Sequence, residues 1–278
     1  MSFSKHHTFT LLNTPRAVHP TEHGYVTYAS LEAEGGKKFM MAEFYDKEWN
    51  PGEEKVELGA NMNAENPTIV NVGGKIFVTF SGDSPFDNQE TCMWLHEHGT
   101  ARVKPLYVTS GMAKVEKNWS PLVYKGKLLF VYSFDPYVVL QCDTDTGKCV
   151  TLMGTLPCDV GRGVIRGSTG IIDTGEFMEG FCVSKHRGHV LTHKVRLSKK
   201  LDLLRIGEPV LYGGTHGPIP RSFWWEHGTS HVSAGSSVYT YSEKSWNDKV
   251  KDMVDTLAFA ESSDVDAPTV DPASPREE

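Results

Sequence analysis

The chain has 278 residues, of which 39% are hydrophobic and 23% charged, a composition typical of a folded globular protein with a substantial core. Its net charge is −7 and its basic residues are spread along the sequence, which argues against a nucleic-acid or anionic-membrane partner. The first fifteen residues lack the apolar run of a signal peptide, and no later run reaches the length of a membrane-spanning helix. A cytoplasmic protein is therefore expected.

The cysteines are too few, and odd in number, for a disulfide framework in a chain of this length. They are Cys92, Cys142, Cys149, Cys158 and Cys182. Reduced thiols with structural roles are expected. Cys142 and Cys149 flank the turn sequence DTDTGK, and they face each other if this turn closes a hairpin. An oxidising compartment would then allow the two to pair.

Short runs of β-branched and aromatic residues, separated by Gly, Asn, Asp and Pro, follow one another along the chain and predict an all-β protein. In chain order, the expected strands are GYVTYASL, KKFMMAEFY, PTIVNV, KIFVTFS, TCMWLHE, SPLVYK, KLLFVYS, VVLQCD, EGFCVS, VLTHKVRL and SVYTYSE. One short helical turn is expected near SWNDKVKDMVDTL.

These strands repeat. NPTIVNVGGKIFVTFSGDSP and SPLVYKGKLLFVYSFDP both read as Pro, apolar strand, Gly-Lys turn, second strand and Asp, which makes Asp83 and Asp135 equivalent positions. A weaker copy, STGIIDTGEFMEGFCVSKH, has Ser184 at the position of the Asp. A fourth copy is expected at WEHGTSHVSAGSSVYTYSE, and an incomplete first copy is expected at GYVTYASLEAEGGKKFMMAEFY.

Repeats of about 50 residues with three or four strands are typical of propeller blades, because one small sheet buries its faces only by stacking on its neighbours. Five copies predict a five-bladed β-propeller over residues 1–260, with antiparallel blades around a central channel. A β-sandwich of meandering strands is the alternative architecture. The acidic, Pro- and Ser-rich segment 261–278 is expected to be a disordered tail.

The first strand of each propeller blade lines the channel, so the residues that precede these strands are expected to meet there. The four segments are NMNAENP, VEKNWSP, GVIRGST and FWWEHGTS. Carboxylates, cations and aromatic faces in one cavity suit a sugar, because aromatic rings stack on its apolar face and polar groups bind its hydroxyls. The four segments together supply the side chains of Glu65, Asn66, Glu116, Lys117, Asn118, Trp119, Arg166, Ser168, Trp225, Glu226 and His227.

EKNWSPLVYKGKLLFVYSFDP, with AENPTIV before it and IRGSTGII after it, resembles the five-bladed β-propeller superfamily of carbohydrate-active enzymes. The nearest likeness is to the β-mannoside phosphorylases and related mannosyl-transferring proteins, over roughly residues 61–212. The resemblance implies an enzyme that cleaves or transfers glycosyl groups, with a glycan substrate. Such phosphorylases invert configuration with one acid as proton donor. In this sequence Asn66 stands where that group usually has Asp.

The catalytic candidates are the carboxylates Glu65, Glu116 and Asp135. Lys117 and Arg166 match positions that would hold an anion, either free phosphate or the diphosphate of a nucleotide-sugar. No other cofactor is expected. The remaining substrate-binding candidates are Asn66, Asn118, Trp119, Ser168, Glu226 and His227. A nucleotide-sugar-dependent glycosyltransferase and a non-catalytic glycan-binding propeller are the alternative functions.

Each candidate also has a structural interpretation. Glu116 and Lys117 fit a solvated pair at a strand start, and Trp119 fits a core position between blades. Arg166 fits a role in binding carbonyls of its Gly-rich segment, and Asp135 fits a turn cap. The histidines at 186, 189 and 193 have no Cys or carboxylate at usable spacing, so no metal site is expected.

Overall fold

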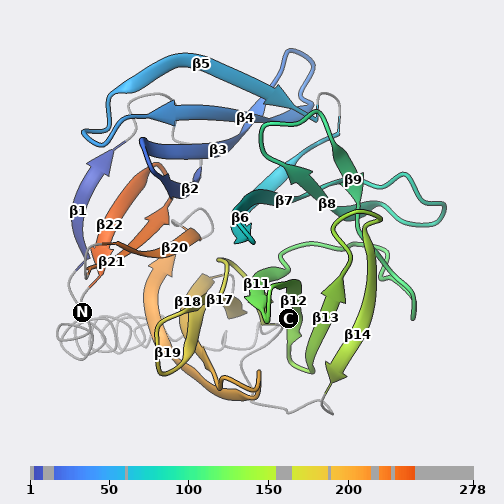
Figure 1. The fold of residues 1–278 in the computed structure, drawn as a ribbon. Coiled ribbons are helices and arrows are strands. Elements are labelled where there is room, and N and C mark those ends of the chain that lie inside the picture. Colours follow the sequence, from blue (N-terminus) through green and yellow to red (C-terminus); the bar gives the residue numbers. More distant parts are fainter. Residues whose placement is uncertain are drawn as a thin grey trace, which may run out of the picture.

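A computed structural model describes residues 3–8, 16–59, 62–154, 165–186, 189–213, 219–226 and 229–241. All regular elements in these ranges are β-strands, and they form five small sheets arranged in a ring (Figure 1). The predicted five-bladed β-propeller is therefore confirmed. The helical turn expected near SWNDKVKDMVDTL and the tail 261–278 lie outside the described residues.

Each blade runs from an inner strand near the axis to an outer strand at the rim. The first blade contains β2 (Arg16–Thr21), β3 (Gly24–Glu32), β4 (Lys38–Tyr45) and β5 (Pro51–Leu58). The second contains β6 (Glu65–Val72), β7 (Lys75–Asp83), β8 (Thr91–Glu97) and β9 (Val103–Pro105). The third contains β11 (Ser120–Tyr124), β12 (Lys127–Phe134), β13 (Tyr137–Cys142) and β14 (Lys148–Gly154), with β10 (Tyr107–Val108) parallel to β14.

The fourth blade starts with two short inner strands that both pair with the next strand, β17. Its strands are β15 (Arg166–Gly167), β16 (Ile172–Asp173), β17 (Met178–His186), β18 (His189–Leu197) and β19 (Leu203–Gly213). The fifth blade contains β20 (Pro220–Glu226), β21 (Thr229–Ala234) and β22 (Ser237–Tyr241).

The two ends of the described chain meet in the fifth blade. Strand β1 (Phe3–Thr8) pairs antiparallel with β22 and forms the outer strand of this sheet. The closure joins the first described strand to the last, so the ring is held by backbone hydrogen bonds as well as by packing. The strand patterns in the sequence did not include β1.

Apolar side chains fill the spaces between neighbouring blades. Between the third and fourth blades, Leu122 and Val131 pack with Ile171 and Val195, and all four are at most 3% exposed. Between the second and third, Phe77 and Leu95 belong to one cluster with Phe130 and Trp119. Burial of these faces holds each inner strand in place, which fixes the residues at its ends.

The repeat register is confirmed in the second and third blades, where Val72 pairs with Lys75 and Tyr124 pairs with Lys127 at equivalent hairpins. The fourth predicted entry segment, FWWEHGTS, is wrong. Its described residues belong to the end of β20 and the start of β21, and the inner strand begins six residues before Glu226, at Pro220. Because strands of similar composition follow one another here, the sequence did not show which of them is the inner strand of the blade.

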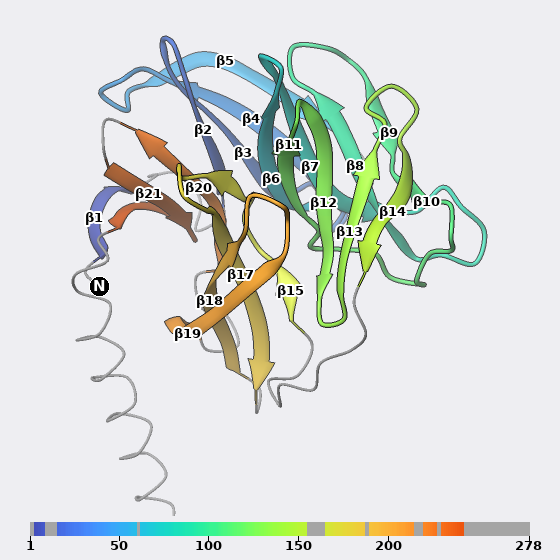
Figure 2. The same ribbon diagram turned by 60° about the horizontal axis from the view of Figure 1, so that its bottom comes forward.

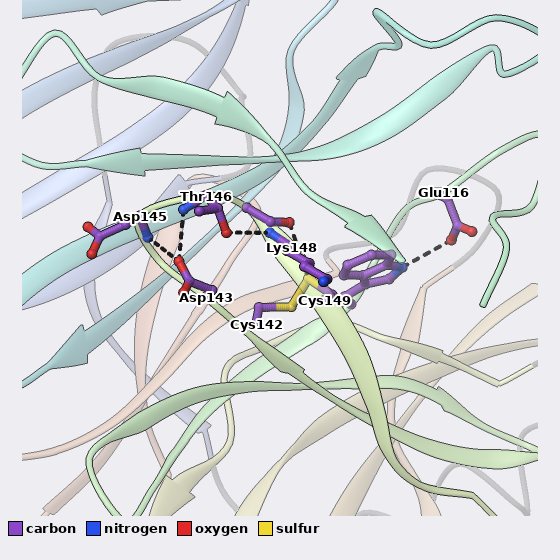
Figure 3. Close-up of a disulfide and its surroundings, with 9 residues drawn as sticks. Glu116, Cys142, Asp143, Asp145, Thr146, Lys148 and Cys149 are labelled. Carbon is purple, nitrogen blue, oxygen red and sulfur yellow. Dashed lines mark hydrogen bonds between the residues drawn. A yellow bond between two sulfur atoms is a disulfide. The ribbon is translucent and has the colours of Figure 1, made fainter. Parts of the chain in front are cut away.

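The expectation of reduced thiols is wrong for one pair. Cys142 and Cys149 lie directly opposite each other on β13 and β14, with 4.1 Å between their Cα atoms, and form a disulfide (Figure 3). The hairpin predicted around DTDTGK is confirmed, because the Asp143 carboxylate accepts hydrogen bonds from the backbone N–H groups of Asp145 and Thr146. Cys92 and Cys182 are free and buried. In the described part of the chain, no helix could span a membrane.

Candidate functional site

A cavity of about 580 Å³ opens where the inner strands of several blades begin. Its polar lining includes Asn66 of β6, Arg166 of β15 and Arg221 of β20, together with Lys117 and Asn118 just before β11. Ser184 and Lys185, near the end of β17, and the apolar Val183, Val190 and Ile219 complete the lining. Of the residues predicted at strand starts, Asn66, Lys117, Asn118 and Arg166 line this one cavity.

The antiparallel pairing explains why β17 also contributes. Arg166 of β15 pairs with Val183, so the last residues of β17 lie at the same end of the propeller as the start of β15. Figure 2 shows β15 between β17 and the strands of the third blade. Ser184, which lines the cavity, occupies the position in this blade that corresponds to Asp83 and Asp135 in the sequence repeat.

Asn66 and Asn118 both have left-handed backbones, with φ of 56° and 61°. Asn tolerates this conformation better than most residues, and its cost of about 1 kcal/mol is typical of positions that a functional site constrains. Both side chains line the cavity. The start of β6 and the segment before β11 therefore present two amide groups to any ligand bound there.

Arg221 is the most deeply placed cation of the cavity. It is 7% exposed, and its Nε has no hydrogen-bond partner in the described residues. Burial lowers the pKa of Arg221 to about 10, whereas the charge of Glu65 acts in the opposite direction. At neutral pH the guanidinium is still charged, so a buried cation with spare donors faces the cavity.

The other three cations of the cavity, Lys117, Arg166 and Lys185, also form no ion pair with any described residue. No described carboxylate is among the lining residues. Four positive groups around one enclosed space create a strongly positive potential, which favours an anion. Chemically, the arrangement suits a phosphate or a phosphorylated sugar.

Glu65 lies at the edge of this arrangement. It precedes Asn66, its side chain is 44% exposed, and it forms an ion pair with Lys38. The negative charge of Glu65 also raises the pKa of Arg221, against the effect of burial. Of the three carboxylates proposed as catalytic, Glu65 is the one that the structure brings next to the cavity.

Glu116 is placed elsewhere. It is 3% exposed, and its carboxylate accepts hydrogen bonds from the Ala113 backbone N–H at 2.6 Å, the Tyr132 hydroxyl at 2.8 Å and the Trp119 indole N–H at 3.2 Å. Figure 3 shows Glu116 at its bond to the indole. Glu116 is not among the residues that line the cavity, and its carboxylate holds the segment before β11 in place.

Trp119 does not form a stacking surface in the cavity. Its ring is 2% exposed and packs on Phe130 and Tyr132, with ring centroids 5.6 and 5.3 Å apart. The alternative interpretation, a core residue between blades, is correct. No described aromatic residue lines the cavity, and Val183, Val190 and Ile219 supply its apolar surface instead.

Three further candidates are not among the lining residues. Ser168 is 4% exposed and donates a hydrogen bond to the Pro220 carbonyl, which ties the fourth blade to the fifth. Asp135 follows β12 and precedes a cis proline, at the same end of the propeller as the cavity. Glu226 lies at the far end of β20 and accepts hydrogen bonds from Tyr25 and Trp224. His227 lies outside the described residues.

The sequence interpretation missed Arg221 and Lys185 as site residues. Arg221 belongs to the segment Ile219-Pro220-Arg221-Ser222, which resembles Ile165-Arg166-Gly167-Ser168 at the start of the preceding blade. That similarity could have indicated Arg221, but the sequence interpretation placed the start of the fifth blade after this residue. Lys185 had no such signal, because a lysine near the end of a middle strand is ordinary.

Within the described residues, no group of three or more His, Cys, Asp or Glu side chains is placed to hold a metal ion. His193, one of the histidines grouped in the sequence, hydrogen-bonds with Ser184 and with the Gly207 carbonyl.

Comparison with known proteins gives sequence relatives of one kind. A β-mannosyltransferase 3 of Komagataella phaffii is 37% identical over 94 residues, covering 32% of this chain and 14% of the relative. A β-mannosyltransferase 2 of the same organism is 27% identical over 180 residues, covering 48% of this chain and 27% of the relative. The matched segments thus span 14% and 27% of these longer proteins. No family model matches the chain.

Comparison of structures gives five-bladed propellers. A β-1,2-mannobiose phosphorylase from Listeria innocua, solved with β-1,2-mannobiose, superposes with a TM-score of 0.58 at 13% identity, over 86% of this chain and 89% of that one. An α-L-arabinofuranosidase from Lactobacillus brevis superposes with a TM-score of 0.57 at 13% identity, over 84% and 93%. The chain therefore has the fold of carbohydrate-active five-bladed propellers. The resemblance inferred from the sequence is confirmed, and its sequence relatives lie among the β-mannosyltransferases.

Proposed function

We propose that this protein is a glycosyl-transferring enzyme of the mannoside type that uses a phosphate group as reactant or as part of its donor. The observation that carries the proposal is the set of four cations, Lys117, Arg166, Lys185 and Arg221, around one cavity with no described carboxylate in its lining. A hydrolase needs only water beside the sugar, whereas phosphate needs positive partners. The sequence relatives and the fold support a sugar as the other ligand.

In the proposed reaction, a phosphate oxygen held by the cations attacks the anomeric carbon of a β-mannoside. The new carbon–oxygen bond to phosphate forms while the bond to the glycosidic oxygen breaks, and configuration inverts. Glu65 donates a proton to the departing oxygen, and in the reverse direction its carboxylate takes the proton of the acceptor hydroxyl. The products are mannose 1-phosphate and a shortened glycan. The two amides of Asn66 and Asn118 bind sugar hydroxyls.

The test is release of mannose 1-phosphate from β-1,2-mannobiose in the presence of inorganic phosphate, with the reverse reaction followed by release of phosphate. Lys117→Ala and Arg166→Ala should each raise the KM for phosphate at least about 10-fold, because a charge-assisted hydrogen bond contributes about 1.5–3 kcal/mol. Lys127→Ala is the matched control, because it removes an exposed lysine at the start of β12, at the opposite end of the blade from the cavity. Turnover that proceeds equally without phosphate would contradict the proposal.

A nucleotide-sugar donor uses the same cations, so the assay includes a nucleoside diphosphate mannose as second donor. Transfer from that donor, without phosphorolysis, would assign the cations to its diphosphate.

Asn66 in the cavity favours a second candidate, a propeller that binds a phosphorylated sugar without converting it, because an amide neither donates nor takes a proton in the required way. Binding of mannose 1-phosphate with no turnover in either direction, and no effect of Glu65→Gln on affinity, would support this candidate.

A further inference from the structure

Ser184 and His193 form a hydrogen-bonded pair whose first member lines the cavity. The two residues lie on adjacent strands, because Ser184 pairs with Leu191 and His193 pairs with Cys182 in the β17–β18 register. Diagonal neighbours of this kind share one face of a sheet. The Ser184 Oγ is 2.8 Å from the His193 Nε2, and each residue is 2% exposed.

The outer strand of the blade, β19, determines where the imidazole proton lies. His193 Nδ1 is 2.9 Å from the Gly207 carbonyl oxygen of β19, next to an irregularity in the β18–β19 register. A carbonyl oxygen only accepts hydrogen bonds, so Nδ1 carries a proton. A neutral imidazole carries a proton on only one of its two nitrogens, and the other nitrogen accepts. Nε2 is therefore an acceptor.

The hydroxyl proton of Ser184 is consequently committed to His193. The serine then presents only lone pairs to the cavity, although every charged group around it is a hydrogen-bond donor. An acceptor in such a place repels an anion whose oxygens are all unprotonated. It instead binds an anion that carries a hydroxyl of its own.

Resting on the proposed function, we infer that Ser184 accepts a hydrogen bond from the P–OH of hydrogenphosphate, and that this contact makes the cavity select phosphate over sulfate. The two ions have the same shape and charge when hydrogenphosphate is the main form, but only hydrogenphosphate has a proton to donate. Lys117, Arg166 and Arg221 supply the attraction common to both anions. Ser184, oriented by His193, supplies the discrimination.

The test is calorimetric titration of the wild-type protein with phosphate, arsenate and sulfate at about pH 8, above the ordinary histidine pKa of about 6.5. Phosphate and arsenate, which both carry a hydroxyl, should bind at least about 10-fold more tightly than sulfate, the effect expected from one hydrogen bond to a charged group. Sulfate binding as tight as that of phosphate would overturn the inference. This comparison needs no substituted protein.

Ser184→Ala should bring the affinities for phosphate and sulfate to within about 3-fold of each other, whereas Ser184→Thr, which keeps the hydroxyl, should preserve the preference. Ser237→Ala, a buried serine of the fifth blade, is the matched control, and thermal unfolding checks that each variant folds. A phosphate preference that survives Ser184→Ala in a folded protein would overturn the inference.

The same titrations distinguish a failure of the role of Ser184 from a failure of the proposed function. Equal binding of phosphate and sulfate refutes the role of Ser184 but leaves the cationic phosphate site intact. Absence of binding by all three anions refutes the proposed function and this inference together.

Discussion

The guanidinium of Arg221 and the carboxylate of Glu65 attract each other from different blades, but they do not form an ion pair. Glu65 pairs with Lys38, and its charge only partly offsets the effect of burial, which lowers the pKa of Arg221 to about 10. A buried cation without a paired counter-ion is costly for stability. We interpret Arg221 as a residue kept for ligand binding.

Arg221→Met should therefore weaken phosphate binding at least about 10-fold while leaving the melting temperature unchanged or raising it, because the variant removes a charge that burial disfavours. Calorimetric titration and thermal unfolding measure the two effects. Arg205→Met removes an exposed arginine of β19 and should change neither. A variant that unfolds readily and binds phosphate normally when folded would show that Arg221 is structural.

Acid should destabilise the protein through His19. Burial, followed by the charge of His98, lowers the pKa of His19 to about 4. The unfolded chain takes up a proton below the ordinary histidine pKa of about 6.5, whereas the folded chain does not until about 4. The free energy of unfolding is therefore unaffected above about pH 6.5. It falls by up to about 3 kcal/mol as the pH drops towards about 4.

The check is the melting temperature between about pH 7 and about pH 4.5, a range that brackets most of this titration. His19→Asn should flatten the fall, whereas His23→Asn, which removes an exposed histidine of the same hairpin, should not. Burial also lowers the pKa of His96 and His98, so part of the acid sensitivity should remain in the first variant.

Glu116→Gln should lower the free energy of unfolding by about 2 kcal/mol, because the amide nitrogen would face one of the three donors that now bind the carboxylate. Phosphate affinity should change little. Glu57→Gln, on the exposed face of β5, is the control. Loss of turnover with unchanged stability would restore Glu116 as a catalytic candidate.

Gly167→Ala should disturb the cavity wall. A Cβ at this position would lie 2.4 Å from the Asn118 carbonyl oxygen and 2.5 Å from the Ser120 Oγ, so β15 and the segment before β11 would have to separate. We expect a loss of stability of about 2 kcal/mol or more, with weaker ligand binding. Gly52→Ala, whose nearest contact would be 3.5 Å, should be tolerated, and equal effects of the two variants would contradict this account.

The Cys142–Cys149 disulfide should stabilise the third blade by about 2 kcal/mol, because it closes a short loop in the unfolded chain. A reductant should lower the melting temperature of the wild type but not of Cys142→Ala/Cys149→Ala. Alkylation of both thiols in the unreduced protein would show that the bond is absent.

The architecture could be predicted because it is written in local patterns. Alternating apolar residues, Gly-Lys turns and the repeat that aligns Asp83 with Asp135 are each properties of a short segment. Five such segments bury their apolar faces by stacking on one another in a ring. The same patterns placed Lys117, Asn118 and Arg166 at strand starts, and the structure brings them together with Asn66. To this extent the lining of the cavity followed from sequence alone.

Tertiary structure decided which way the other side chains face. Glu116 and Trp119 lie within two residues of Lys117 in sequence, but both are buried, whereas Lys117 lines the cavity. Arg221 lines the cavity because the inner strand of the last blade begins at Pro220, which the sequence pattern did not reveal. The roles of Ser184 and His193 depend on three adjacent strands, because a proton's position is set by hydrogen-bond partners distant in the chain.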